Sequence, residues 1–230
     1  MKKKWQIYET DEKQIEEISK KYNINKLIAT ILINRKIKEE EIEIFLNPTR
    51  KNFHNPYLMP DMEKAVSRII QAIEKEEKII IYGDYDVDGI TSITVLKSFL
   101  KDIGVEALTY IPNRLEEGYG LNKPAIEKIA KEECTLMITV DCGISGIEEI
   151  KYANQLGIET IVTDHHEVGD ELPQAIAVID AKRKDNKYPC RDLAGVGVVF
   201  KLIQAIRNEI KFRRKRISKI FRYCMCRNDI

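Results

Sequence analysis

The feature that most restricts the fold of this chain is an alternation of strand-like and helix-like segments that begins at Lys78. Short runs rich in β-branched residues alternate with longer segments whose apolar residues recur every three or four positions. The strand-like runs cover residues 78–83, 105–112, 135–141, 158–164 and 175–180, and the helix-like segments cover residues 89–104, 123–133 and 145–157. This order predicts an α/β fold, in which a mostly parallel sheet is flanked by helices.

Acidic residues and histidines stand at the ends of three of these strands. In an open α/β sheet the carboxyl ends of the strands form the ligand site, so these side chains are expected to converge. Each aspartate alone is also compatible with a helix cap or a turn, and adjacent histidines alone are usually surface residues. The joint placement of these side chains is what indicates a site. The residues are Asp84, Asp86, Asp88, Asp141, Asp164, His165 and His166.

A cluster of this composition predicts a metal centre. Without a cation, the carboxylates would repel one another and lose hydration, at a cost of several kcal/mol. Carboxylates mixed with imidazoles suit Mn²⁺ or Mg²⁺, while the imidazoles leave zinc and iron open. Two metals about 3.5 to 4 Å apart hold a phosphate oxygen and activate water, which favours phosphoester hydrolysis. In a regular strand His165 and His166 would point to opposite sides, so both reach one site only if the chain turns there.

A calcium-binding EF-hand loop is the first alternative for "DYDVDG", residues 84–89. That loop needs a glutamate at its twelfth position, where this chain has Val95. It also follows a helix, whereas Ile79, Ile80 and Ile81 form a β-branched run typical of a buried strand. The sequence therefore disfavours a calcium loop.

The first 76 residues are expected to be helical and to pack on the sheet domain. Apolar residues recur at helical spacing between residues 11 and 46, and three prolines interrupt the pattern in "FLNPTRKNFHNPYLMPD". A further helix is expected to begin with Asp61 as its N-cap. The predicted domains are therefore residues 1–76, residues 77–210 and a tail of residues 211–230.

Three further residues near the predicted site have an expected role. Arg114 lies in the polar loop "PNRLEEGYG", where it either grips a phosphate or is solvated. Gly89 permits close approach of the backbone where the first strand meets the next helix. Cys142 has no evident orienting partner for a nucleophile and is expected to be a small buried residue.

Composition and charge restrict the compartment and the kinds of site expected for the protein. The five cysteines contain no CxxC pair, which argues against a disulfide framework or a zinc knuckle. There is no run of about 18 apolar residues and no apolar signal segment, so a cytoplasmic protein is expected. Residues 1–210 carry 30 basic and 36 acidic residues, whereas residues 211–230 carry eight basic residues and one acidic residue. The body is acidic and the tail alone is basic.

Several segments resemble a known family. "DYDVDG", "VDCG" and "TDHHE", in this order, are similar to motifs of the DHH phosphoesterase superfamily. "LINRKIKEEEIEIFLNP", "MPDMEKAVSRIIQAI", "IPNRLEEGYGLN" and "DLAGVGVVFKL" further resemble the RecJ family of single-stranded-DNA-specific exonucleases, over roughly residues 5–208. The resemblance implies a Mn²⁺- or Mg²⁺-dependent exonuclease that digests single-stranded DNA from its 5′ end in repair and recombination. It also implies single-stranded-DNA-binding protein and a helicase as partners.

The resemblance assigns roles to individual positions. Asp84 and Asp164 would support the metal ligands, and Arg114 and Tyr119 would contact the substrate. Many superfamily members have a histidine at the position of Tyr82, which departs from that pattern. The metal ligands and catalytic residues implied by the family motifs are Asp86, Asp88, Asp141, His165 and His166.

The family continues beyond the length of this chain, with a further ligating aspartate, a second catalytic domain and a domain that binds single-stranded DNA. We therefore expect an N-terminal fragment that is inactive or weakly active alone. A shifted reading frame is one account of residues 211–230, because codons can be chosen for "IFRYCMCR" so that the shifted frame reads Tyr-Leu-Asp-Ile-Val-Cys-Val-Gly, which resembles the family. The alternative account is a real basic tail that binds nucleic acid. Two other functions remain open: a phosphodiesterase of short oligonucleotides or cyclic dinucleotides, and a non-catalytic binding module.

Overall fold

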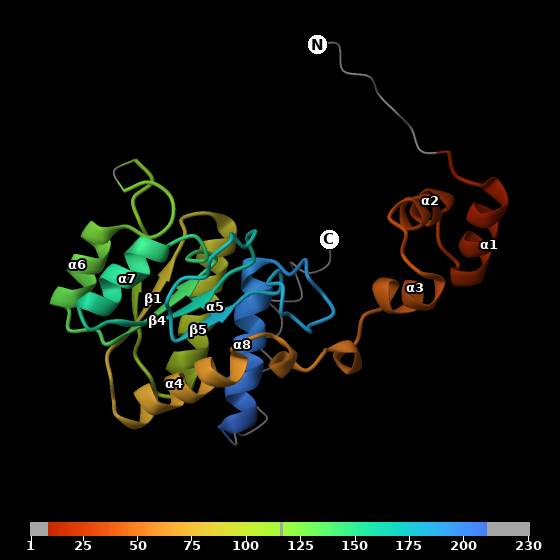
Figure 1. The fold of residues 1–230 in the computed structure, drawn as a ribbon. Helices are drawn as coiled ribbons and strands as arrows, with labels where there is room; N and C mark the ends of the chain where they lie inside the picture. Colours follow the sequence, from red (N-terminus) through yellow and green to blue (C-terminus); the bar gives the residue numbers. More distant parts are fainter. Residues whose placement is uncertain (1–8, 116, 211–230) are drawn as a thin grey trace, which may run out of the picture. The chain divides into compact units, whose positions relative to one another are not determined.

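The chain divides into two units after Phe53. A computed structural model of the protein describes residues 9–115 and 117–210 (Figure 1). The expected tail, residues 211–230, lies outside the described residues. Within the described residues, no helix combines the length and the apolar character needed to cross a bilayer.

The first unit is a small helical cluster. It contains α1 (Glu12–Tyr22), α2 (Lys26–Asn34), α3 (Glu39–Leu46) and the short 3₁₀ helix η1 (Arg50–Asn52). The side chains of Asp11 and Asn25 accept hydrogen bonds from backbone amides in the first turns of α1 and α2, which explains where these helices begin. The three α-helices bury a common apolar core of Ile18, Ala29, Leu32 and Ile42.

The second unit is built on a five-stranded sheet in which every pairing is parallel. The strands are β1 (Ile79–Gly83), β2 (Leu108–Tyr110), β3 (Leu136–Val140), β4 (Glu159–Thr163) and β5 (Ala177–Ile179), in the spatial order β2-β1-β3-β4-β5. The predicted α/β class is confirmed. The strands β1 and β3 are fully buried and mainly apolar because both faces of a parallel sheet are covered by helices.

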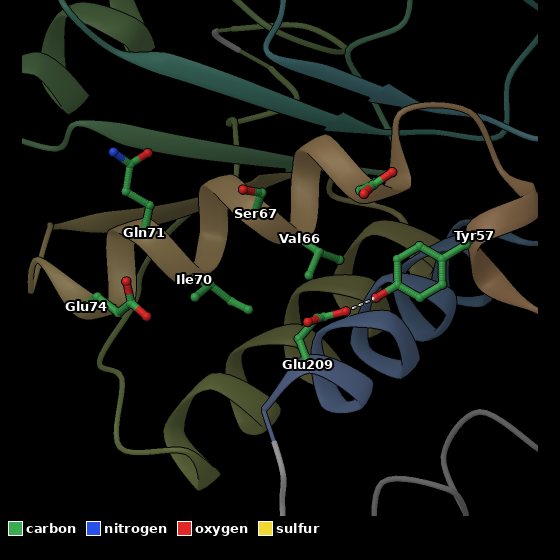
Figure 2. A pocket seen from close by; sticks show the side chains of 8 residues that line it. Tyr57, Val66, Ser67, Ile70, Gln71, Glu74 and Glu209 are labelled. Atoms are coloured by element: carbon green, nitrogen blue, oxygen red, sulfur yellow. Dashed lines mark hydrogen bonds between the residues drawn. The ribbon is translucent and has the colours of Figure 1, made fainter.

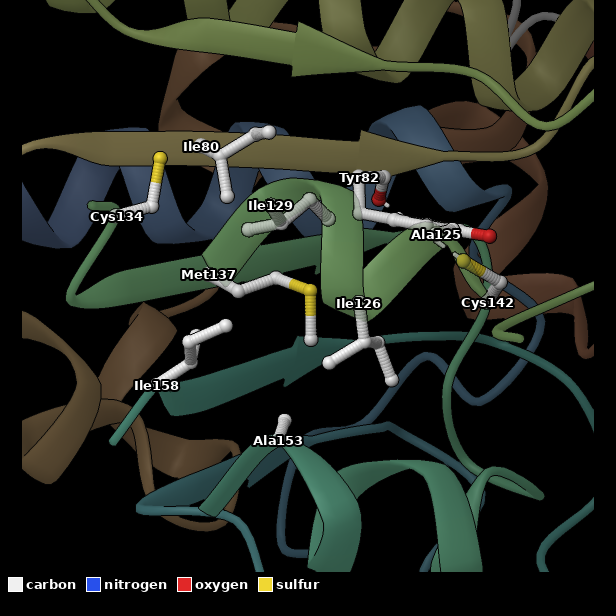
Figure 3. Close-up of a cluster of buried hydrophobic side chains, with 10 residues drawn as sticks. All are labelled: Ile80, Tyr82, Ala125, Ile126, Ile129, Cys134, Met137, Cys142, Ala153 and Ile158. Atoms are coloured by element: carbon white, nitrogen blue, oxygen red, sulfur yellow. Dashed lines mark hydrogen bonds between the residues drawn. The ribbon is translucent and has the colours of Figure 1, made fainter. Parts of the chain in front are cut away.

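Two layers of helices cover the sheet. On one face, α6 (Lys123–Lys131) and α7 (Ile147–Gln155) pack on β1 and β3 around the buried cluster shown in Figure 3, which includes Ile80, Ile126 and Met137. The helix α8 (Gly195–Glu209) packs on both α4 (Met62–Glu74) and α5 (Val87–Asp102), and the helices α4, α5 and α8 contact β5, β1 and β3, respectively. A 3₁₀ helix, η2 (Pro56–Leu58), packs on α4 and α8.

The division of the chain differs from the expected boundary at residue 76. Helix α4 contacts α8 and β5, so it is part of the sheet unit. The sequence did not show this, because an amphipathic pattern identifies a buried face but not the element that covers it. Asp61 is the N-cap of α4 as expected, although its carboxylate pairs with Lys64 and Arg183 instead of capping the helix amides. Packing of the first unit on the second stays a prediction.

Candidate metal centre

Four buried aspartates stand side by side at the carboxyl edge of the sheet. The last residues of β1, β3, β4 and β5 are in register, Gly83 with Val140, Val140 with Thr163, and Thr163 with Ile179. The residue that follows each of these strands is an aspartate with at most 1% of its surface exposed: Asp84, Asp141, Asp164 and Asp180. The backbone amides of Asp141 and Asp164 continue the ladder, donating to Thr163 O and Ile179 O at 3.0 Å. One strand end after another thus contributes a carboxylate to the same edge.

The sequence analysis identified three members of this row and missed Asp180. Asp180 is the last residue of the predicted strand 175–180, so the rule that located the other three also applied to it. In the structure Asp180 is fully buried; Oδ1 accepts a hydrogen bond from the Lys182 amide, while Oδ2 has no partner among the described residues.

Three side chains of the predicted site form a group with the dimensions of a metal site. One ligand atom from each of Asp141, His165 and His166 can be chosen so that all lie within 4.8 Å of one another. Nε2 of His165 lies 3.0 Å from Oδ1 of Asp141. Yet Asp141 Oδ1 has no hydrogen bond of acceptable geometry among the described residues. Two ligand atoms that are close but not aligned on each other are suited to a shared cation between them.

Asp164 organises the turn that brings the two histidines together. Its Oδ1 accepts hydrogen bonds from the amides of His165 at 2.7 Å and His166 at 3.2 Å, and from Nδ1 of His166 at 2.7 Å. Its Oδ2 accepts a hydrogen bond from the Ile144 amide at 2.9 Å. The imidazole centroids therefore lie 4.7 Å apart instead of on opposite sides of a strand. Burial alone would raise the pKa of Asp164, but these hydrogen bonds, led by that from His166, lower it.

Asp86 and Asp88 lie outside the tight group, at the start of α5. The side chain of Asp86 caps this helix by accepting a hydrogen bond from Gly89 N at 2.9 Å. Both carboxylates raise the pKa of Asp141 electrostatically. Gly89 is required here as expected, because a Cβ would lie 2.3 Å from Asp84 O.

The edge carries more buried negative charge than its protein partners neutralise. Burial, opposed by the contact with His165, raises the pKa of Asp141. Burial also raises the pKa of Asp84, neither of whose carboxylate oxygens has a hydrogen bond of good geometry among the described residues. The pKa of Asp180 rises to about 6, again mainly through burial. Buried carboxylates without partners are costly unless a cation compensates them.

The backbone of Asp141 is itself unusual. Its φ of 60° lies in the left-handed region, which costs a residue with a Cβ about 1 kcal/mol or more. Such outliers cluster at functional sites, where the surrounding structure fixes them. Here Asp141 follows a central strand, and its carboxylate lies against Gly195, the first residue of α8.

The loop after β2 brings one of the expected substrate-contacting residues to the histidines. The hydroxyl of Tyr119 lies 3.1 Å from Nε2 of His166. Arg114 does not touch the histidines; its guanidinium carbon lies 5.3 Å from the ring centroid of Tyr85. Sequence reasoning missed Tyr85, because a residue between two motif aspartates gives no separate signal.

Tyr82 and Cys142 are structural residues. The buried Tyr82 hydroxyl donates to Gly120 O at 2.9 Å and accepts from Asn122 Nδ2 at 3.2 Å, so it anchors the start of the segment leading to α6. Tyr82 and Cys142 belong to the apolar cluster under α6 and α7 (Figure 3). Burial raises the pKa of the Cys142 thiol well above its usual value, which disfavours a thiolate nucleophile.

A separate groove of about 630 Å³ lies along α4 and the last turn of α8 (Figure 2). Its walls include Tyr57, Glu63, Glu74 and Glu209, and the Tyr57 hydroxyl donates to Glu209 at 3.0 Å. Gly195 and Glu209 are at opposite ends of the 15-residue helix α8, about 20 Å apart, so the groove is not part of the metal centre.

Comparison with known proteins places the chain in a family. Residues 78–226 match the family model described as the DHH family, N-terminal domain. The chain is 40% identical over 210 residues to the single-stranded-DNA-specific exonuclease RecJ of Bacillus subtilis, covering 91% of this chain and 27% of the relative. It is 40% identical over 151 residues to the RecJ of Escherichia coli, covering 65% of this chain and 26% of the relative. The chain thus spans about a quarter of the length of these curated relatives.

Solved structures agree with this placement. A crystal structure of exonuclease RecJ bound to manganese superposes with a TM-score of 0.62 at 32% identity, covering 68% of this chain and 40% of that one. The structure of RecJ from Thermus thermophilus in complex with Mn²⁺ gives a TM-score of 0.68 at 25% identity, covering 90% of this chain and 28% of that one. Since the family model spans most of the residues and the fold agrees, the chain belongs to the DHH family.

Proposed function

We propose that this chain contributes the DHH domain of a metal-dependent exonuclease, which hydrolyses single-stranded DNA from the 5′ end in repair and recombination. The observation that carries the proposal is the convergence of Asp141, His165 and His166 beside a row of buried carboxylates. The names of the relatives, single-stranded-DNA-specific exonuclease RecJ, supply the substrate class. Mn²⁺ or Mg²⁺ is the proposed cofactor, because solved RecJ structures are described as complexes with these ions.

The residues fit such a cofactor. Oxygen donors mixed with imidazole nitrogens suit Mn²⁺, and Asp141 Oδ1 is a buried acceptor with no hydrogen bond of acceptable geometry among the described residues. Asp84 and Asp164 would support the metal ligands without binding the metal themselves. The proposed ligands and catalytic residues are Asp86, Asp88, Asp141, His165 and His166.

The ligands as proposed divide into two sets by position. Asp141, His165 and His166 form the compact group, while Asp86 and Asp88 approach from the first turn of α5. Two such sets are suited to a two-metal centre. A bound metal pair supplies charge for the phosphate oxygens and lowers the pKa of an attacking water.

Other side chains of the chain would orient the metal ligands and hold the DNA. Asp164 fixes the ring of His166 through Nδ1, which leaves Nε2 directed away from that carboxylate toward Tyr119. Arg114 and Tyr119, on the loop between β2 and α6, are proposed to contact the DNA phosphates and bases. Residues 1–210 carry six more acidic than basic residues, so affinity for DNA would depend on such local cationic groups and on bound metal. Single-stranded-DNA-binding protein and a helicase are proposed as partners of the whole enzyme.

The test uses a 5′-phosphorylated single-stranded oligonucleotide with a 3′ fluorophore, excess protein and Mn²⁺. Because the chain spans about a quarter of the length of its relatives, at most slow stepwise shortening from the 5′ end is expected, and Asp141→Asn is expected to remove it. Cyclic dinucleotides and a duplex serve as competing substrates in the same assay. Faster cleavage of cyclic dinucleotides than of single-stranded DNA would favour the alternative phosphodiesterase. Binding of Mn²⁺ that is sensitive to Asp141→Asn, without cleavage of any substrate by this chain or by a longer form of the length of its relatives, would instead indicate a non-catalytic module.

A further inference from the structure

A continuous set of ring contacts connects the histidines to Arg114. The ring of Tyr119 lies edge-on to that of His166, with centroids 6.0 Å apart and an interplanar angle of 84°. Tyr85 lies edge-on to Tyr119 in turn, at 6.3 Å and 85°. The guanidinium carbon of Arg114 lies 5.3 Å from the centroid of Tyr85. Four side chains from three different loops thus contact one another in sequence.

Tyr85 is held where it lies by its neighbours in the chain. It stands between the buried Asp84 and the helix-capping Asp86, so its backbone is fixed by the end of β1 and the start of α5. Its ring is half-buried. No hydrogen bond joins its hydroxyl to the described residues, whereas its ring contacts both Tyr119 and Arg114.

Arg114, in contrast, stands on an exposed loop. Its guanidinium lies over the ring of Tyr85, and it forms no salt bridge with another described residue. An unsupported arginine of this kind samples many rotamers and loses that freedom when it binds a phosphate. A ring under the guanidinium reduces this loss and leaves the N–H groups free to donate.

We propose that Tyr85 is a positioning residue that holds Arg114 beside the metal centre, ready to bind a phosphate of the DNA. The proposal rests on the proposed function, because it assigns Arg114 to a phosphate of that substrate. It adds a specific requirement: the aromatic ring of Tyr85 is needed and the hydroxyl is not. Tyr85→Phe should therefore behave as the original protein, while Tyr85→Leu, which keeps apolar bulk and removes the ring, should not.

The first test reads the side chain itself and needs no DNA. In the NMR spectrum of the full chain, the Nε–Hε signal of Arg114, assigned through its loss in Arg114→Met, should be ordered and shifted by the Tyr85 ring. Tyr85→Phe should keep that shift and Tyr85→Leu should abolish it and increase the mobility of the group. An Arg114 signal that is equally mobile in all three proteins would overturn the proposal.

The second test is a double-mutant cycle on binding of a 5′-phosphorylated single-stranded oligonucleotide, with Ca²⁺ to prevent turnover. Tyr85→Leu should weaken binding about twofold to fivefold, as expected for an exposed cation–π contact, and should have no effect in the Arg114→Met background. An equal loss in both backgrounds would show that Tyr85 contacts the DNA by itself and would overturn the positioning role. Thermal unfolding of each variant separates these outcomes from loss of the fold. If the original protein binds no DNA while the NMR result holds, the proposed function fails and the contact between Tyr85 and Arg114 stands.

Discussion

Gly195 and Asp141 are in such close contact that position 195 has no room for a side chain. A Cβ on Gly195 would lie 2.3 Å from Oδ1 and 2.8 Å from Cγ of Asp141. The carboxylate is itself fixed by its buried position at the end of β3, so the clash cannot be relieved at the surface. The first turn of α8 therefore determines where the Asp141 oxygen stands.

This contact predicts that Gly195→Ala weakens metal binding. The alanine methyl would push Asp141 Oδ1 away from Nε2 of His165, and disturbing the groups that orient a metal ligand typically costs about 10- to 100-fold in affinity. Isothermal titration with Mn²⁺ measures the effect. Gly169→Ala is the matched control, since a Cβ there meets nothing within 4 Å. Equal Mn²⁺ affinities for the two variants would contradict the prediction.

Asp164→Asn should reduce both stability and metal affinity. The amide nitrogen of asparagine accepts no hydrogen bond, so the substitution loses either the bond from Ile144 to Oδ2 or the bonds from His165 and His166 to Oδ1. A loss of about 2 to 4 kcal/mol in the free energy of unfolding is expected for such a buried, multiply bonded charge. Urea unfolding of the metal-free protein checks this value. Asp192→Asn, on an exposed residue, provides the baseline, and a loss no larger than that baseline would refute the role given to Asp164.

Asp180 predicts a pH-dependent gain in stability on mutation. Its pKa is raised to about 6 in the folded protein, against about 3.9 in an unfolded chain. Below about pH 4, Asp180 is protonated in both the folded and the unfolded chain, so it does not lower the free energy of unfolding. Between about pH 4 and 6 only the unfolded chain releases the proton, so the free energy of unfolding falls as the pH rises. Asp180→Asn removes this loss and should stabilise the metal-free protein by about 1 to 3 kcal/mol at pH 7.

The control for Asp180 is the same measurement at pH 4, where the gain should vanish. Asparagine can still accept the hydrogen bond from the Lys182 amide, so no bond is lost through the substitution. Unfolding curves in EDTA at the two pH values are sufficient. A gain of equal size at both would mean that charge is not its cause.

Metal addition should stabilise the fold itself. Mn²⁺ at about 100 times its dissociation constant is expected to add about 2.7 kcal/mol to the free energy of unfolding, because the site exists only in the folded chain. Thermal unfolding with Mn²⁺ and with EDTA measures the difference. Asp141→Asn should abolish most of it, and an unchanged rise in melting temperature in that variant would place the bound ion elsewhere.

Sequence periodicity was sufficient for the sheet and for part of the site. The apolar runs before Asp84, Asp141 and Asp164 identify central parallel strands, and the carboxyl-end rule then places these aspartates together. Asp180 escaped notice because a single aspartate after a strand is also what a turn contains. The assignment of α4 to the sheet unit also could not be predicted, because the sequence shows the apolar face of α4 but not the elements that cover it.

Contacts between distant loops could not be predicted from the sequence. Gly195 and Asp141 are far apart in the chain, and their approach depends on how α8 enters the edge of the sheet. The stacking of Arg114 on Tyr85 likewise depends on the path of the loop after β2. Neither residue pair has a spacing or a pattern that points to the other, because tertiary packing alone determines these contacts.

The shared register of β1, β3, β4 and β5 has an evolutionary consequence. Neighbouring strands are about 4.8 Å apart, and a slip of one residue turns each side chain to the opposite face. An insertion or deletion inside any of these strands would therefore remove one carboxylate from the row, even if the sheet still formed. Changes of length are compatible with the row only in the connections, so homologous chains should vary in loop length while the distance from strand to aspartate stays constant.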